Sequence, residues 1–480
     1  MSGKTWQSLL EHVRTLVKEQ RLGSAGDTII VAVSGGPDSV ALLHVLHALS
    51  DEYQWKLVCA HLNHGFRPEE SAQEAQYVAK ISSDLHIPFE LEEVSTPDYM
   101  VETGQGPQEA ARTLRYDFLH RIAEKWSAHS IALAHHMDDQ AETVLMRILR
   151  GSGAEGLSGI KMRRTEKNVE LIRPFLRIYK TTLIHACEEC DFGYITDSSN
   201  LHRKYTRNRI RLDVLPFLEQ FNEQLVPSLA RLAEIVGTEN DYIQQETGTL
   251  YAELVKEEEG SFSFEVTSFV EVHVALQRRL IKLILSYMSP SYEQFDFSKI
   301  EMVRGQIMQS GLTSWSLDIG DKVTCVREYQ NIRFIRGVPK FYEPYCIPIL
   351  RNNEVISIPF TKEQLDIRLL PWNRNDSDQM ELSSEEAFFD ADLLTFPLCL
   401  RSRRQGDSFK LTGEGGTKKV KNLFIDEKIP LSQRNTLPLL ADFHGQVLWI
   451  PGIRRSGSAL VHPGTSCVVH MRRIKTEENV

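Results

Sequence analysis

The chain has 480 residues, 41% of them apolar, and a net charge of −10, so it is too long for one core and too acidic for an indiscriminate nucleic-acid binder. No run of 18 apolar residues occurs and no apolar segment follows the first lysine, which excludes a membrane-spanning helix and predicts that there is no signal peptide. Seven scattered cysteines fit a reducing compartment better than a disulfide framework, so we expect a cytoplasmic protein.

The first 216 residues alternate between apolar runs and helical patterns. A helix with one apolar side is expected over 1–26. Strands are expected at 28–33, 56–62, 87–94 and 130–135. Helices are expected at 38–50, 69–85, 106–127 and 138–150, and the segments 170–175 and 192–196 are candidates for an edge strand. This alternation predicts a parallel sheet that is covered on both faces.

A glycine turn joins the first strand to its helix. It consists of Ser34, Gly35, Gly36, Pro37, Asp38 and Ser39. Two glycines let the backbone bend tightly, and the free N–H groups and positive end of the helix face whatever lies in the bend. The turn has neither the lysine of a Walker A loop nor the G-x-G-x-x-G spacing of a dinucleotide turn. We expect a bound phosphate here; the alternative is an ordinary glycine turn.

The turn is similar to the SGGxDS loop of the ATP pyrophosphatase (PP-loop) family. Members of that family cleave ATP between the α- and β-phosphates and transfer AMP to an oxygen. The resemblance implies that all six residues of the turn bind ATP and that Asp38 also takes part in catalysis.

A polar segment, His61–Arg67, follows the second predicted strand. The carboxyl ends of parallel strands meet at one edge, so this segment should lie beside the glycine turn. Backbone groups near Ala60 and His61 are candidates to hold adenine, and a polar loop without a ligand is the alternative.

Two arginines, Arg112 and Arg115, lie three residues apart on a predicted helix and share one face. Two cations on one face repel each other unless an anion lies opposite. A phosphate or a carboxylate ligand is the functional interpretation, and pairing with a neighbouring acidic side chain is the structural one.

The segment after the fourth strand carries two histidines and three acids. Asp138 is expected to cap the following helix. Asp139 and Glu142, at i and i+3, then present two carboxylates on one side, which suits Mg²⁺ beside a triphosphate or an incoming ammonium. His135 is expected to aim into the same crevice, and Asp38 and Asp139 are the candidate Mg²⁺ ligands. The spacing is not that of a H-E-x-x-H zinc site.

Cys187 and Cys190 form a C-x-x-C motif without a second pair at metal-ligand spacing. The segment looks helical, and the acids around it should raise the thiol pKa values. We therefore expect neither a metal nor a redox role.

Basic residues gather at 201–211 and at 401–428 on this acidic background. Such clusters suit a polyanion that docks at defined places, and a solvated helix face explains the charge equally well. The candidate polyanion-binding residues are Arg203, Lys204, Arg207, Arg209, Lys418, Lys419 and Lys421.

The pattern changes after residue 216. A long helical stretch is expected over 217–256, followed by a short strand at 261–266, helices near 269–288 and 294–310, and short antiparallel strands over 312–337. The stretch 339–350 looks like a linker, and the rest is strand-rich with one basic helix at 417–428. We predict domains at 1–216, 217–350 and 351–480.

These motifs together resemble the tRNA(Ile)-lysidine synthetases, bacterial members of the PP-loop family. The resemblance extends to Asp197–Asn200, Arg207–Arg211, Leu215-Pro216, Arg403–Asp407, Gly416–Lys421 and Trp449–Gly452. It implies an α/β protein in which a parallel-sheet PP-loop ATP pyrophosphatase domain precedes a mainly helical middle domain and a small α+β C-terminal domain. The two basic segments would then bind tRNA.

The resemblance also implies a reaction. ATP adenylates the 2-carbonyl oxygen of the wobble cytidine in the CAU-anticodon tRNA(Ile), and the side-chain amine of free L-lysine displaces AMP. The products are lysidine, AMP and pyrophosphate, with ATP and Mg²⁺ required. Neutral His135 or a carboxylate would accept the amine's proton, and Asp139 would hold an ammonium of lysine. Arg112 and Arg115 would flank the reacting groups, which makes all four residues candidate catalytic residues with Asp38.

Three alternatives remain open at the level of sequence. A tRNA 2-thiolation enzyme shares the loop but relies on cysteines near the active site. An ATP-dependent amidating ligase of the same superfamily needs no basic C-terminal domain, and a tRNA-binding module needs no complete catalytic constellation. A homodimer is compatible with the sequence, which does not determine the oligomeric state.

Overall fold

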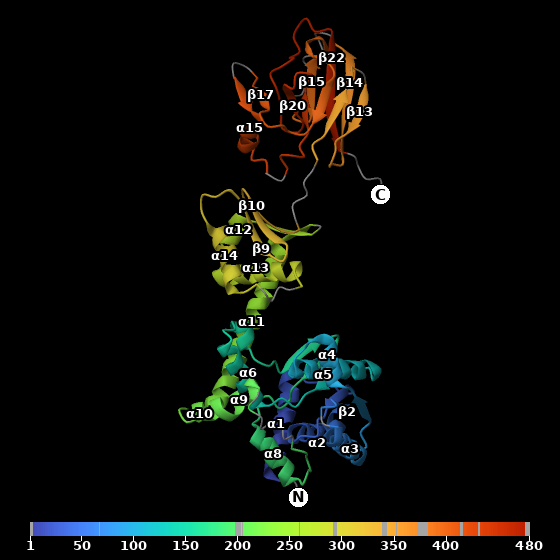
Figure 1. Cartoon of the computed structure of the whole chain (residues 1–480), viewed down its shortest axis with the longest axis vertical. Coiled ribbons are helices and arrows are strands. Elements are labelled where there is room, and N and C mark those ends of the chain that lie inside the picture. The colour runs from blue at the N-terminus through green and yellow to red at the C-terminus, as the bar shows by residue number, and fades with distance from the viewer. Residues whose placement is uncertain are drawn as a thin grey trace. The chain divides into compact units, whose positions relative to one another are not determined.

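The computed structural model describes residues 3–66, 68–196, 203, 205–258, 260–290, 295–337, 343–351, 353–372, 383–412, 416–430 and 433–475. The chain divides into two compact units, Met1–Gln245 and Glu246–Val480, whose elements are labelled in Figure 1. Within the described ranges, no helix combines the length and the apolar character that crossing a membrane requires.

The first unit is a parallel sheet with helices on both faces. Its strands are β1 Thr28–Ala32, β2 Lys56–Asn63, β3 Phe89–Glu93, β4 Ser130–Ala132, β5 Arg163–Glu166 and β6 Val169–Ile172. Its helices are α1 Lys4–Gln20, α2 Pro37–Tyr53, α3 Pro68–Asp84, α4 Thr96–Thr103, α5 Pro107–Lys125, α6 Met137–Leu149, α7 Ala154–Leu157, α8 Lys180–Glu189, α9 Thr206–Arg209, the π-helical turn η2 Ile210–Val214, α10 Leu215–Glu219 and α11 Leu225–Leu254, which runs on into the second unit.

The strand order β3-β2-β1-β4-β6-β5 creates a switch point in the sheet. The chain proceeds from β1 outward to β2 and β3, and then returns to the other side of β1 as β4. All neighbouring pairs are parallel except β5 with β6. The ends of β1 and β4 therefore diverge into loops on opposite sides of a crevice, which is where open α/β sheets bind ligands. The parallel sheet predicted from the sequence is confirmed.

Alternate residues of β1 explain why both faces are covered. Ile30 is fully buried on the face that α5 covers. Ile29 and Val31 are fully buried on the opposite face, in a core with α1, α2, α3 and α8. Because both faces of the strand are apolar, the sheet holds the glycine turn at its edge on a rigid base.

A short helical segment beyond the sheet docks on α6. Ile210, Leu215 and Val226 are buried together with Ala141 of α6. This apolar contact brings α9, η2 and α10 to the crevice, although they follow β4 by more than sixty residues of sequence.

The first part of the second unit combines helices with a five-stranded antiparallel sheet of order β7-β8-β11-β10-β9. Its elements after α11 are β7 Lys256–Glu258, β8 Ser261–Glu265, α12 Val266–Val270, α13 Val274–Met288, α14 Phe297–Met308, β9 Ser314–Gly320, β10 Val323–Glu328 and β11 Asn331–Arg336. The strands expected at 261–266 and over 312–337 are confirmed.

The remainder of the second unit is rich in strands, as the sequence predicted. Its elements are β12 Cys346–Ile349, β13 Glu354–Ser357, β14 Glu363–Pro371, β15 Glu386–Asp390, the 3₁₀ turn η5 Ala391–Leu393, β16 Leu398–Arg401, β17 Ser408–Lys410, β18 Thr417–Lys419, α15 Val420–Asp426, β19 Leu439–Ala441, β20 Val447–Ile450, β21 Arg454–Arg455 and β22 Cys467–Lys475. One sheet has the order β12-β16-β19-β20-β17-β18 with β21 beside β20, and the other has the order β13-β14-β22-β15.

Three local expectations were wrong. The segment 192–196 is not a strand; instead, the N–H of Ile195 donates to Gly35 at 2.9 Å, and the β5–β6 hairpin completes the sheet. The basic helix begins at Val420 rather than 417, because residues 417–419 pair with β17 as β18. The third expectation concerned the cysteines, for which no disulfides were expected. A disulfide joins Cys346 to Cys399, whose Cα atoms lie 6.0 Å apart on neighbouring strands.

Candidate active site

The glycine turn leaves the carboxyl end of β1 and starts α2. Gly35 has a φ of 89°, where a side chain would strain the backbone, and Gly36 is the N-cap of α2. The Ser39 hydroxyl donates to the Gly36 carbonyl at 2.9 Å and accepts the Ser34 N–H at 3.1 Å. Pro37 occupies the first turn of the helix, where its missing N–H costs nothing. The turn is therefore closed on itself at a helix N-terminus, a geometry that suits a phosphate.

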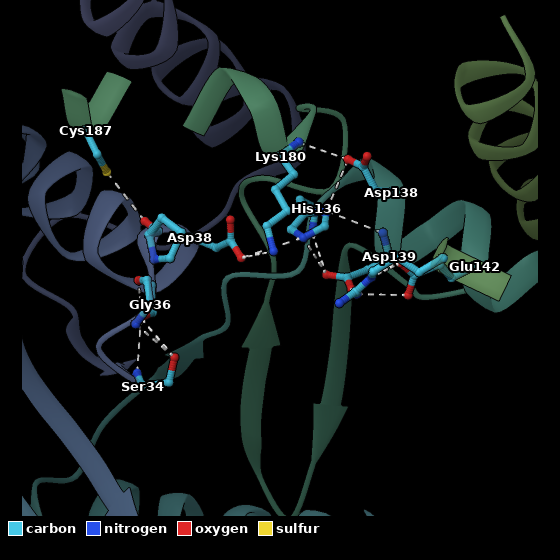
Figure 2. A network of polar contacts seen from close by, with 12 residues as sticks. Ser34, Gly36, Asp38, His136, Asp138, Asp139, Glu142, Lys180 and Cys187 are labelled. Atoms are coloured by element: carbon cyan, nitrogen blue, oxygen red, sulfur yellow. Dashed lines mark hydrogen bonds and ion pairs between the residues drawn. The ribbon is translucent and has the colours of Figure 1, made fainter. Parts of the chain in front are cut away.

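Asp38 points from α2 toward the end of β4. Its Oδ2 lies 3.7 Å from His136 Nε2 and 3.6 Å from Lys180 Nζ, as Figure 2 shows. Its Oδ1 is buried and has no hydrogen-bond partner among the described residues. Burial raises the pKa of Asp38, and the nearby His136 and Lys180 only partly oppose it. The site thus holds an unsatisfied carboxylate oxygen beside the phosphate turn.

His136, and not Asp138, caps α6. The Asp139 carboxylate accepts the His136 N–H at 3.2 Å, while the Asp139 N–H lies 3.4 Å from His136 Nδ1. Asp138 instead accepts the backbone N–H of Lys180 at 2.9 Å, so the predicted cap was wrong. Burial lowers the pKa of His136, but Asp138, Asp139 and Asp38 outweigh burial and raise it. The imidazole therefore lies between the carboxylates of both loops (Figure 2).

Asp139 and Glu142 lie on one side of α6, as predicted, but two arginines already pair with them. Arg207 donates to Glu142 at 2.7 Å and to Asp139 at 2.9 Å. Arg211 donates to Glu142 at 2.5 Å and to Asp139 at 3.3 Å. Glu142 is fully buried. Burial raises the pKa of Asp139, but His136 and Arg207 outweigh it and lower the pKa to about 2.

Arg112 and Arg115 are exposed on α5 and have no carboxylate partner within the described residues. The Arg112 guanidinium lies over the Tyr116 ring, 4.7 Å from its centre. Desolvation lowers the pKa of Arg115, Tyr116 opposes the shift, and the charges of Arg112 and Arg207 lower it further. Mutual repulsion of this kind favours an anionic ligand at this place.

His135 is neutral in this cationic surrounding. Its Nδ1 is buried and has no partner in the described part of the chain. Burial lowers the pKa of His135 to about 3; Asp139 opposes the shift, and Arg173, Arg207 and Arg115 add to it. A bound anion would offset these positive charges and raise the pKa again.

Ala60 and His61 lie inside β2 rather than beyond its end. Ala60 is buried, and its carbonyl accepts the Val33 N–H at 2.9 Å. His61 Nδ1 lies 2.8 Å from the Val33 carbonyl, and its Nε2 is buried without a partner among the described residues. The Ala60 carbonyl is thus occupied, and the His61 ring is buried.

The first basic segment contains residues of two kinds. Arg207 is bound inside the crevice, whereas Arg209 is exposed. Arg203 is exposed and pairs with Asp213 at 2.9 Å. Lys204 and the segment 197–200 lie outside the described residues.

The second basic segment is mostly exposed. Lys419 and Lys421 are exposed, whereas Lys418 pairs with Asp426. Arg401, at the start of this segment, is buried and forms a bidentate pair with Asp407 at 2.8 and 2.9 Å. Arg401 is therefore part of the core of its sheet and not of a surface.

Sequence reasoning left out two residues at the centre of the site, His136 and Lys180. His136 follows His135 at a strand end, where neighbouring side chains point in opposite directions, so one of the two had to face the capping position. Lys180 carries no sequence signal, because only the packing of α8 brings it to Asp38.

Mg²⁺ fits this site through one carboxylate. No group of three His, Cys, Asp or Glu side chains that could hold a metal occurs in the described residues. Mg²⁺ usually binds through one or two carboxylates together with substrate phosphates and water. The unpartnered Asp38 Oδ1 at the phosphate turn meets that requirement, whereas arginines occupy Asp139.

Two cysteines of this unit, Cys59 and Cys187, are buried and weakly acidic. Burial raises the pKa of Cys59 and of Cys187 to about 12. Cys187 Sγ lies 3.6 Å from the Pro37 carbonyl, next to the glycine turn (Figure 2). Thiols this weakly acidic supply no thiolate for sulfur transfer.

Family profiles match two parts of the chain. A profile for the PP-loop domain matches residues 7–218, and one for the TilS substrate C-terminal domain matches residues 398–471. The first range contains every crevice residue described above, and the second contains Lys419 and Lys421.

Two curated relatives match nearly the whole chain. The tRNA(Ile)-lysidine synthase of Bacillus subtilis is 33% identical over 93% of this chain and 94% of its own length. That of Geobacillus kaustophilus is 30% identical over 93% of this chain and 95% of its own length. The crystal structure of a TilS C-terminal domain covers 28% of this chain and 100% of that chain at 26% identity, with a TM-score of 0.26.

Proposed function

This chain belongs to the tRNA(Ile)-lysidine synthase family, and we propose that the crevice between β1 and β4 carries out both steps of the reaction with the residues described above. The enzyme is an ATP-dependent ligase that modifies tRNA(Ile). The observation that supports this assignment of residues is the line Asp38–His136–Asp139, which links the phosphate turn to the two carboxylates of α6. Thiolation is not favoured.

In the first step, the glycine turn holds the phosphates of ATP while the 2-carbonyl oxygen of the wobble cytidine attacks the α-phosphorus. The bond to the β-phosphate breaks, and pyrophosphate leaves. The helix N-terminus at Gly36, together with Lys180, stabilises the charge that develops on the leaving group. Asp38 Oδ1 would hold Mg²⁺, which would neutralise phosphate charge.

In the second step, Asp139 binds an ammonium of free L-lysine. Arg207 and Arg211 already pair with both carboxylates of α6 in this crevice. Lysine must therefore compete with these arginines or share the carboxylates with them. Glu142 is fully buried, whereas Asp139 is partly exposed, so Asp139 is the carboxylate that lysine can reach.

The ε-amine of lysine must lose a proton before it attacks C2 of the adenylated cytidine and expels AMP. His135 is neutral and carries an unpartnered Nδ1, which has a free lone pair in the tautomer that holds its proton on Nε2. Anionic phosphate beside Arg112 and Arg115 would raise the pKa of His135 and strengthen it as a base.

The tRNA is held outside this crevice as well. Lys419 and Lys421 are exposed cations in the part of the chain that the C-terminal profile covers. We assign the ATP chemistry to 1–216, a connecting and tRNA-contacting role to 217–350, and recognition of the tRNA body to 351–480. The protein is expected to act in the cytoplasm, and its oligomeric state is open, a homodimer included.

The decisive experiment incubates the purified protein with labelled lysine, ATP, Mg²⁺ and CAU-anticodon tRNA(Ile), and omits each component in turn. Labelled lysine should enter tRNA only in the complete mixture, with AMP and pyrophosphate as the nucleotide products. Formation of ADP, or incorporation without ATP, would contradict the proposal. Methionine tRNA, which has the same unmodified anticodon, is the matched control and should stay unlabelled.

A further inference from the structure

Two phenylalanine rings stand exposed on the segment that closes the crevice. Phe217 of α10 is 55% exposed and Phe221, just after it, is 77% exposed. Their ring centres are 5.4 Å apart at an interplanar angle of 68°. Because both rings are largely exposed, they contribute little to the stability of the fold. Neighbouring exposed apolar side chains of this kind are typical of an interaction site.

The backbone beneath these rings is firmly held. Leu215, two residues before Phe217, is buried with Ile210 and Val226 in the apolar contact with α6. The N–H of Phe221 donates to the Leu218 carbonyl at 3.0 Å. The rings therefore project from a fixed base and not from a loose end.

The same segment reaches directly into the crevice. Arg207 and Arg211 contact Asp139 and Glu142, and α9, η2 and α10 follow one another without a break. At the rise of an α-helix, Phe217 lies about 15 Å along the chain from Arg207. The two rings and the crevice arginines therefore belong to one short, continuous helical segment.

The charge of this segment suits a polyanion. Arg209 lies between Arg207 and the two rings in sequence; it is exposed, and no carboxylate partner is found for it in the described residues. Arg203 is also exposed, in a surface pair with Asp213. The acids of this stretch are Glu219, Glu223 and Asp213, which pairs with Arg203.

We propose that Phe217 and Phe221 form a stacking platform for anticodon-loop bases next to the wobble cytidine. The inference rests on the function proposed above, since the wobble base must leave its stack to reach the phosphate turn. Its neighbours then lose a stacking partner, and exposed aromatic rings replace that partner in most sequence-specific RNA recognition.

The test uses an anticodon stem-loop in which 2-aminopurine replaces the middle adenine of the CAU anticodon. Binding to the wild-type protein should change the fluorescence, because this base reports stacking. The variant with Phe217→Leu and Phe221→Leu should bind about tenfold or more weakly and lose the signal, since leucine keeps apolar contact but offers no ring. Phe217→Tyr with Phe221→Tyr should retain both.

Tyr242→Leu is the matched control, because Tyr242 is an exposed aromatic residue on α11 in the same unit, 63% exposed. It should leave binding and signal unchanged. Equal losses in this control, or unchanged binding in the leucine pair, would overturn the platform. A change of sedimentation coefficient in the leucine pair without RNA would assign the rings to a contact between two copies and also overturn it.

Failure of the stacking platform can be distinguished from failure of the proposed function. If the wild-type protein forms no lysidine in the complete mixture, the proposed function fails. If it forms lysidine and the leucine pair does so with unchanged KM for tRNA, only the platform fails.

Discussion

Two basic segments of similar composition behave differently in the folded chain. In the first, Arg207 and Arg211 turn inward and neutralise the buried Glu142 and the nearly buried Asp139. In the second, Lys419 and Lys421 stay exposed on a strand edge and a helix start. In the sequence, the high density of basic residues predicted polyanion binding for both segments alike. Whether a cation serves a buried site or a surface depends on carboxylates that lie far away in sequence.

The largest expected effect falls at the phosphate turn. Asp38→Asn should lower kcat for lysidine formation by about 10²–10³-fold, because the only unpartnered carboxylate oxygen described there is lost. Stability should not fall, since the raised pKa means that burial disfavours the ionised Asp38. Steady-state kinetics and thermal unfolding check the two halves; Asp241→Asn, at an exposed pair, is the control. Normal turnover in Asp38→Asn would remove Asp38 from the mechanism.

Removing the carboxylate that pairs with Arg207 and Arg211 should destabilise the fold. Glu142→Ala should lower the free energy of unfolding by about 3 kcal/mol, because two guanidinium groups lose a buried carboxylate. Glu234→Ala, whose carboxylate is 55% exposed beside Arg177, should cost less than about 1 kcal/mol. Urea unfolding of both variants gives the difference directly. Equal losses of unfolding free energy in the two variants would mean that the ion pairs of Glu142 stabilise the fold no more than an exposed surface pair does.

The next prediction tests whether Asp139, which pairs with the arginines of the first segment, also binds lysine. Asp139→Asn should raise KM for lysine about tenfold or more, since a charge-assisted hydrogen bond becomes a neutral one. The KM for ATP should change much less, because the phosphate turn is intact. Initial rates at varied lysine concentration test this. Unchanged lysine kinetics would leave Asp139 as a partner of the arginines alone.

The outward lysines should affect only binding to tRNA. With Lys419→Ala and Lys421→Ala, the slope of log K against log salt should become shallower by about 1.5, as two phosphate contacts release fewer counterions. Lys418→Ala should have a smaller effect because Asp426 already pairs with Lys418. Filter binding at several salt concentrations measures the slopes. A normal slope in the double variant would place the tRNA body elsewhere.

The smallest effect is a pH dependence from His136. Its pKa is raised in the folded state by Asp138, Asp139 and Asp38 against the effect of burial. The stabilisation is therefore complete below the unfolded value of about 6.5 and is lost as pH rises through the folded pKa. His136→Asn, which can still cap α6, should flatten this trend in chemical unfolding. A wild-type stability that rises across the same pH window would contradict it.

The sequence was sufficient for features that depend on local pattern. The strand–turn–helix at Ser34–Ser39 and the alternation of β1 follow from residues that are adjacent in the chain. The carboxylate pair on α6 followed from helical spacing. What failed depended on competition between neighbours, as when His136 rather than Asp138 took the cap.

The remaining misses depended on tertiary contacts. Nothing near Lys180 indicates that it lies beside Asp38, because the packing of α8 on α2 decides this. Lys418 and Lys419 were expected on a helix, but pairing with β17 made that stretch a strand. Helical propensity is a weak preference that such pairing overrides.

The contact between Gly35 and Ile195 has a consequence for biosynthesis. The carbonyl of the phosphate turn accepts its hydrogen bond from a residue that the ribosome adds much later, and Arg207 and Arg211 follow later still. At translation rates of about 5–20 residues per second, the turn exists for roughly 8–35 s before its closing contacts can form. The sequence of the phosphate turn is therefore synthesised well before the complete ATP site can fold.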